Sequence, residues 1–99
     1  MIDIYVVHNN PNVEDIIWSV PTEAQPFFHF LDIDSKKDRS KAFKFKQEWG
    51  ARKNPFCLLE KDGKAVKAFY TETGDDAIEQ LIKYLRNYGT EWTKSRIWF

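Results

Sequence analysis

A chain of 99 residues accommodates one domain of ordinary size and leaves no room for a second. Hydrophobic residues make up 42% and aromatic residues 16%, which suffices for a buried core and excludes a globally disordered chain. The formal net charge of +0 argues against the strongly basic surface of a dedicated nucleic-acid binder.

Several other classes of protein are disfavoured by features that the sequence lacks. No apolar stretch approaches the roughly 18 residues of a membrane span. The start Met1-Ile2-Asp3 has no basic segment ahead of an apolar one, so we expect no signal peptide. The single cysteine, Cys57, excludes an internal disulfide, and with only His8 and His29 it makes no credible zinc site. We therefore expect a cytoplasmic protein that binds no membrane, metal or cofactor.

The first third of the chain predicts a strand, a helix and a second strand. Residues 2–7 are rich in β-branched and aromatic side chains, which is typical of a strand. A helix should follow, with Asn10 as its N-cap, Pro11 at its first position and Pro21 as its stop. Residues 27–33 form an unbroken apolar run, which indicates a strand inside a sheet that is covered on both faces.

Residues 35–50 fit two structures. The positions of Phe43, Phe45 and Trp49 match the strict alternation of a strand. Lys, Arg, Gln, Glu and Ala dominate the segment, however, and Gly50 follows as a C-terminal stop. The composition therefore favours a helix.

The second half of the chain predicts a β-hairpin and a final helix. Residues 56–60 and 65–70 read as strands joined by a turn at Asp62-Gly63. Residues 75–88 carry an apolar stripe at helical spacing, and Gly89 should end this helix. The order β-α-β-α-β-β-α predicts an α/β protein with a four-stranded mixed sheet. Its first two strands should be parallel, its last two antiparallel, and its helices on both faces.

The run from Trp49 to Lys64 resembles the thioredoxin superfamily. It is similar to that family's aromatic-Gly-aliphatic-Arg segment, followed by a proline, an apolar strand and a Lys-Asp-Gly turn at the same spacing. The resemblance covers roughly residues 1–88, without the extra N-terminal strand and helix of full thioredoxins, so the layout is closer to a glutaredoxin. It implies a thioredoxin-like domain over residues 1–90 with an aromatic C-terminal tail at residues 91–99.

In this register the family's redox Cys-x-x-Cys motif falls on Asn9-Asn10-Pro11-Asn12. Dithiol–disulfide exchange needs a thiolate at the helix N-terminus and a second thiol that resolves the mixed disulfide. An amide is neither a nucleophile nor a leaving group. The resemblance therefore implies a redox-inactive protein, and an enzymatic activity is not expected.

By the same resemblance the Asn54-Pro55 bond is cis and faces the Asn9–Asn12 loop. The family uses the backbone before this proline to pair with an extended substrate strand or with glutathione, and such pairing needs only main-chain groups. We therefore expect a binding module for a protein or extended peptide, with glutathione as a further candidate ligand. The residues expected to form its surface are His8, Asn9, Asn10, Pro11, Asn12, Asn54 and Pro55.

Two other functions stay open at this point. A thiol–disulfide or glutathione-dependent oxidoreductase would use Cys57, although a free cysteine inside an apolar strand is usually a small core residue. A weak nucleic-acid binder would use the basic segment 36–53, which holds eight Lys and Arg residues. Residues 1–34, by contrast, hold six Asp and Glu residues and no Lys or Arg. We favour the alternative that segment 36–53 is a solvated basic helix face, which is the usual meaning of such a run of charges.

Four smaller expectations complete the sequence-based interpretation. His8 should lie at the rim of the loop, and His29 should be a strand residue whose ring is hydrogen-bonded. Asp3 should be an exposed acid at a strand end. The aromatic residues of the tail should either fold back over the domain or anchor a partner; these are Trp92, Trp98 and Phe99.

Overall fold

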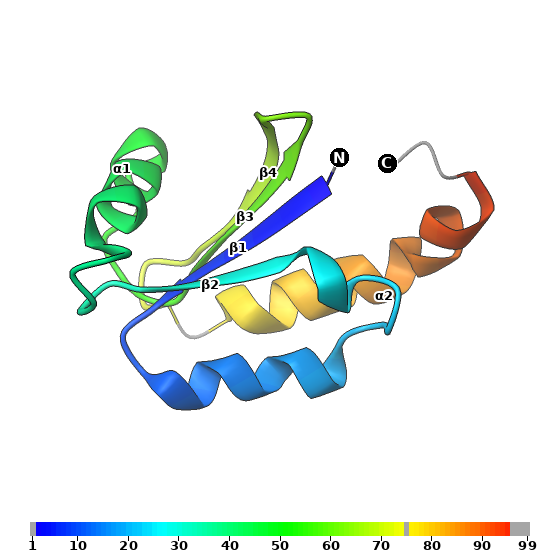
Figure 1. The fold of residues 1–99 in the computed structure, drawn as a ribbon, viewed down its shortest axis with the longest axis horizontal. Coiled ribbons are helices and arrows are strands. Elements are labelled where there is room, and N and C mark those ends of the chain that lie inside the picture. The colour runs from blue at the N-terminus through cyan, green and yellow to red at the C-terminus, as the bar shows by residue number, and fades with distance from the viewer. Residues whose placement is uncertain (1, 75, 96–99) are drawn as a thin grey trace.

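The computed structural model describes residues 2–74 and 76–95, and the side chains of residues 2–74 and 76–87. A four-stranded sheet has the strand order β2-β1-β3-β4, which differs from the order along the chain. Strand β1 (Ile2–His8) is parallel to β2 (Phe28–Asp32) and antiparallel to β3 (Phe56–Lys61), which pairs in turn with β4 (Lys64–Phe69). The predicted α/β class with a mixed sheet is confirmed (Figure 1).

Helices cover both faces of this sheet (Figure 1). Helix α1 (Arg39–Trp49) packs on one face, and the 3₁₀ helix η1 (Pro11–Ser19) and helix α2 (Ala77–Ser95) pack on the other. Strand β1 contributes alternate residues to both cores: Ile4 and Val6 face η1 and α2, whereas Tyr5 and Val7 face α1. Because β1 is buried on both faces, its sequence is almost continuously apolar.

Strand β2 lies at an edge of the sheet, so the prediction of an interior strand is wrong. Phe28 and Phe30 pack against the core beneath η1 and α2, and Leu31 packs against the core beneath α1. The strand is thus covered on both faces although no described strand pairs with its outer edge, and coverage of the faces is what makes its sequence apolar.

The segment after β1 begins as predicted but is not an α-helix. Asn10 is its N-cap: its Oδ1 accepts a hydrogen bond from the Asn12 N–H at 3.1 Å, and the Val13 N–H donates to the Asn10 carbonyl at 2.9 Å. Nine residues in 3₁₀ geometry are unusual. Branching at Cβ lowers the α-helix propensity of Val13, Ile16 and Ile17, which pack on the core. A second 3₁₀ helix of three residues, η2 (Gln25–Phe27), lies between η1 and β2 and has no counterpart in the predicted element order.

The other local predictions in the middle of the chain are confirmed. Residues 39–49 are helical rather than extended, with Ala42 and Phe45 buried. Gly50 ends α1 in the left-handed conformation, at φ 65°, and its N–H donates to the carbonyl of Gln47. Asp62 and Gly63 both have positive φ, at 53° and 81°, as the tight turn between β3 and β4 requires.

Helix α2 continues through Gly89 to Ser95, so the prediction that Gly89 ends it is wrong. A single glycine costs a helix only about 1 kcal/mol relative to alanine, which is too little to stop it alone. Trp92 consequently belongs to α2, while Trp98 and Phe99 lie outside the described residues. The side chains of all three also lie outside the described part, so the prediction that they fold back or anchor a partner stays a prediction. Within the described residues, no helix has the length and apolarity needed to cross a membrane.

Candidate functional site

One end of the sheet gathers segments that are far apart in the sequence. His8, the last residue of β1, pairs in register with Asp32 of β2, and its neighbour Val7 pairs with Phe56 of β3. The loop that follows His8 and the Asn54-Pro55 turn that precedes Phe56 therefore leave from adjacent strands, side by side. The predicted surface residues thus share one end of the sheet.

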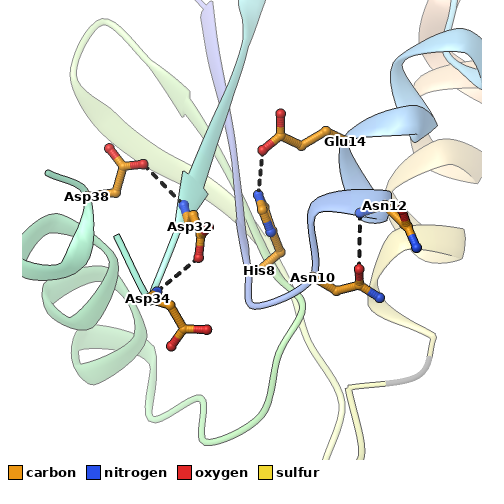
Figure 2. A network of polar contacts seen from close by, with 7 residues as sticks. All are labelled: His8, Asn10, Asn12, Glu14, Asp32, Asp34 and Asp38. Atoms are coloured by element: carbon orange, nitrogen blue, oxygen red, sulfur yellow. Dashed lines mark hydrogen bonds and ion pairs between the residues drawn. The ribbon is translucent and has the colours of Figure 1, made fainter. Parts of the chain in front are cut away.

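The loop after β1 is exposed and capped. Asn9, Asn10, Pro11 and Asn12 are all exposed, and the Asn10 side chain is occupied by its bond to the Asn12 N–H. Within the described residues the side-chain amides of Asn9 and Asn12 make no hydrogen bond, which leaves their donors and acceptors for solvent or a ligand. Figure 2 shows the capped turn at the start of η1.

His8 is not at the loop rim, contrary to the prediction, because only 1% of it is exposed. Its Nε2 lies 3.0 Å from Oε2 of Glu14 in η1 (Figure 2), and its Nδ1 is buried without a partner among the described residues. A carboxylate accepts a hydrogen bond, so Nε2 carries the proton in the neutral ring and Nδ1 has the lone pair. His8 thus fastens the start of the loop to η1 and does not present its ring to a ligand.

Glu14 is the part of this site that sequence reasoning missed. Its carboxylate is 49% exposed, whereas the ring that it holds is buried. The only signal in the sequence is an acid in the first turn of the helix that follows a strand-terminal histidine. That pattern is too common in surface helices to single out Glu14 without the structure.

Acidic residues hold the neighbouring turn after β2. The Asp38 Oδ2 accepts the Asp32 N–H at 3.2 Å, and the Asp32 Oδ1 accepts the Asp34 N–H at 2.9 Å (Figure 2). These carboxylates are used to cap backbone groups between β2 and α1. Among the described residues no group of three or more His, Cys, Asp or Glu side chains could hold a metal ion.

The Asn54-Pro55 turn is held by contacts with two other segments. Its peptide bond is cis, as the resemblance implied, and both residues are half-buried. The Asn54 Oδ1 accepts a hydrogen bond from Nζ of Lys46 in α1 at 2.8 Å. Gly74, at φ 83°, packs against the Asn54 carbonyl so closely that a Cβ there would clash with it. Within the described residues neither the main-chain N–H nor the C=O of Asn54 makes a hydrogen bond.

A groove adjoins this turn, where the loop after α1 faces the loop after β4. Its volume is about 630 Å³. Two exposed basic side chains, Arg52 and Lys53, line it together with Tyr70 and Thr71. No pattern in the sequence indicates this groove, since its two walls are about twenty residues apart in the chain.

Cys57 has no place in the site. The side chain is fully buried in β3 on the face that packs against η1 and α2, and burial raises the pKa of its thiol above 9.0, the ordinary value. A thiol held neutral and away from solvent is a poor nucleophile. The expectation that Cys57 is a small core residue is confirmed.

His29 and Asp3 interact with each other rather than with the site. The His29 Nε2 lies 2.8 Å from the Asp3 Oδ1, and its ring stacks on Tyr5 with centroids 5.0 Å apart. The expected hydrogen-bonded ring of His29 is confirmed. The expectation of a freely exposed Asp3 is wrong: its side chain is 24% exposed, because β2 brings His29 beside it.

No protein-family model matches this chain, and neither the curated proteins nor the solved structures contain a significant match to it. The resemblance to the thioredoxin superfamily therefore stays an inference from the residues of this chain.

Proposed function

We propose that this chain is a redox-inactive, thioredoxin-like binding module that holds an extended segment of another protein at the end of its sheet. The observation that carries the proposal is that the exposed Asn9–Asn12 loop and the Asn54-Pro55 turn leave from adjacent strands. The mixed sheet, with a parallel first pair and an antiparallel last pair, supports the thioredoxin-like assignment.

An extended peptide suits the polar groups that this surface offers. The main-chain N–H of Asn54 is without a partner among the described residues, so a partner strand can pair with it as it would with a sheet edge, whereas Gly74 packs against the Asn54 carbonyl. The side-chain amides of Asn9 and Asn12 each both donate and accept, which matches the alternating groups of a backbone. A small apolar ligand would leave these groups unpaired, at a cost of about 1–3 kcal/mol for each buried one.

The loop is also held in one conformation before a ligand arrives. Asn10 caps η1 and His8 fastens the end of β1 to Glu14, so that both ends of the loop are fixed. A preordered loop loses less conformational entropy on binding than a mobile one.

The topology favours the same end of the sheet. The chain leaves β1 for η1 on one face, and it leaves the parallel neighbour β2 for α1 on the opposite face. In open α/β sheets a crevice forms outside the carboxyl ends of two such strands, and ligands bind there.

The experiment that tests this proposal starts from peptides selected from a random phage-displayed library. Selected peptides should bind wild type, and Asn9→Ala and Asn12→Ala should each weaken binding several-fold. Asn87→Ala is the matched control, because Asn87 is an exposed asparagine outside the loop. It lies about 15 Å along α2 from Ala77, the first residue of that helix. Methylation of alternate backbone nitrogens of the peptide should abolish binding if main-chain pairing holds it.

Two outcomes would contradict the proposal. The first is a selection that yields no peptide bound above background. The second is a set of peptides whose affinity is unchanged by the loop variants and by backbone methylation, which would place the contact elsewhere on the molecule.

A further inference from the structure

One lysine of the basic segment 36–53, Lys46 in α1, is buried, unlike the other basic residues around it. The segment was expected to be a solvated basic face, and that is confirmed for Lys36, Lys37, Arg39, Lys41 and Lys44, which are exposed. It is wrong for Lys46, of which only 7% is exposed. Lys46 falls on the face of α1 that meets the loop before β3, where it reaches Asn54.

The Lys46 ammonium lacks a counter-charge among the described residues. Its one polar side-chain partner is the neutral amide oxygen of Asn54 at 2.8 Å, and no described carboxylate lies within ion-pair distance. An ammonium has three N–H donors, and burying a cation is costly unless it is paired. The site is therefore electrostatically incomplete as it stands.

Two further cations stand on the same side. Arg52 and Lys53 line the groove next to Asn54, and neither forms an ion pair with a described carboxylate. Burial and then the nearby charge of Lys53 lower the pKa of Lys46, which places the two ammonium groups in one positive field. Glu72, the one acid among the described residues that line the groove, is exposed and pairs with none of these cations.

We infer that this groove receives a carboxylate of the bound segment. Arg52 and Lys53, which line the groove, supply the counter-charge together with Lys46, which lies beside the groove at Asn54. The inference rests on the proposed function and names the partner's chemistry: an acidic residue lies beyond the stretch that pairs with Asn54. A guanidinium binds a carboxylate through two parallel hydrogen bonds, and an ammonium adds a point charge. A carboxylate placed there neutralises a cation that no described carboxylate pairs with.

The test uses blocked hexaglutamate and hexaglutamine peptides with calorimetry at low ionic strength. Hexaglutamate should bind wild type and hexaglutamine should not. Lys46→Met should weaken hexaglutamate binding about tenfold or more, because it removes the charge of a residue that is itself mostly buried. Lys44→Met, the same change at an exposed position of the same helix, should weaken it about twofold, as an exposed charge does.

A second readout separates a contact from a change in fold. In protein labelled with ¹⁵N at lysine side chains, hexaglutamate should shift the Lys46 ammonium signal more than that of Lys44 and should raise the pKa of Lys46. Circular dichroism should show that both methionine variants remain folded.

The inference would be overturned by equal losses in the two methionine variants, by an unmoved Lys46 signal, or by inorganic phosphate that binds as tightly as hexaglutamate. This inference alone would be overturned if the library-selected peptides lack acidic residues and their affinity is unchanged by Lys46→Met but lowered by Asn9→Ala. The proposed peptide surface would instead be overturned if Lys46→Met weakens hexaglutamate binding while Asn9→Ala, Asn12→Ala and backbone methylation leave its affinity unchanged.

Discussion

The ring of His8 is buried at the end of β1, and its Nε2 is held 3.0 Å from the carboxylate of Glu14 on η1. This contact joins the last residue of a central strand to the helix that follows the candidate loop. It is the one described side-chain link across that loop.

Removing this carboxylate should destabilise the protein. Glu14→Ala leaves the buried Nε2–H of His8 without its acceptor, which should cost about 1 kcal/mol, since water reaches part of the gap. Glu14→Gln, whose amide oxygen can still accept, should cost less. Urea denaturation measures both, with Asp15→Ala at the next exposed position as the control. Equal stabilities of all four proteins would show that the contact contributes nothing.

Gly74 should tolerate alanine less well than Gly63, although both have φ near 80°. At Gly63 a Cβ meets nothing within 4 Å, so alanine pays only the left-handed backbone cost of about 1 kcal/mol. At Gly74 the Cβ would also clash with the Asn54 carbonyl and displace the Pro55 turn. We expect a loss of about 2 kcal/mol or more and weaker peptide binding. Equal losses of stability in the two variants would mean that the Pro55 turn moves aside at no cost in free energy.

The buried thiol should make stability depend on alkaline pH. Because burial raises the pKa of Cys57 above 9.0, the unfolded chain loses this proton first as the pH rises. Its contribution is therefore full below pH 9 and declines above it, by up to about 1.4 kcal/mol per pH unit. In Cys57→Ala that part of the decline should be absent. Parallel stability curves of the two proteins between pH 8 and 10 would contradict the assignment.

The purified protein should not catalyse disulfide reduction. With asparagine at both motif positions and Cys57 buried, insulin reduction by dithiothreitol should proceed at the uncatalysed rate. Turbidity of precipitating insulin chains follows the reaction. Catalysis that disappears in Cys57→Ser would establish the thiol enzyme that the sequence left open.

Nucleic-acid binding should be weak, insensitive to sequence and lost between low and physiological salt. The exposed cations of α1 can neutralise phosphates, but affinity built on counterion release falls steeply with salt. Fluorescence anisotropy with labelled single-stranded and duplex oligonucleotides measures this. Tight binding at physiological salt would favour the basic segment as the functional surface.

The predictions that succeeded concern interactions between near neighbours in the chain. The Asn10 cap, the Gly50 stop and the Asp62-Gly63 turn each depend on the backbone geometry of a few consecutive residues. Such geometry restricts which residue types are acceptable, so a short stretch of sequence reveals it.

Several of the predictions that failed depend on what packs against a residue from elsewhere. An apolar run reports that β2 is covered on both faces, but it does not report whether a further strand pairs with its edge. His8 and Lys46 are likewise buried in the fold, where they contact Glu14 and Asn54, six and eight residues away. For the candidate site, the proximity of the Asn9–Asn12 loop to the Asn54-Pro55 turn was predicted only through the family resemblance.

The basic residues of α1 and the acids Glu14 and Asp15 of η1 stand on opposite sides of one sheet, although the chain as a whole carries no net charge. The molecule is therefore an electric dipole whose axis crosses the sheet. An incoming charged chain experiences a torque before it touches the surface, and this aligns the two molecules during the encounter. Orientation of that kind accelerates association more than it strengthens the complex, and added salt removes it.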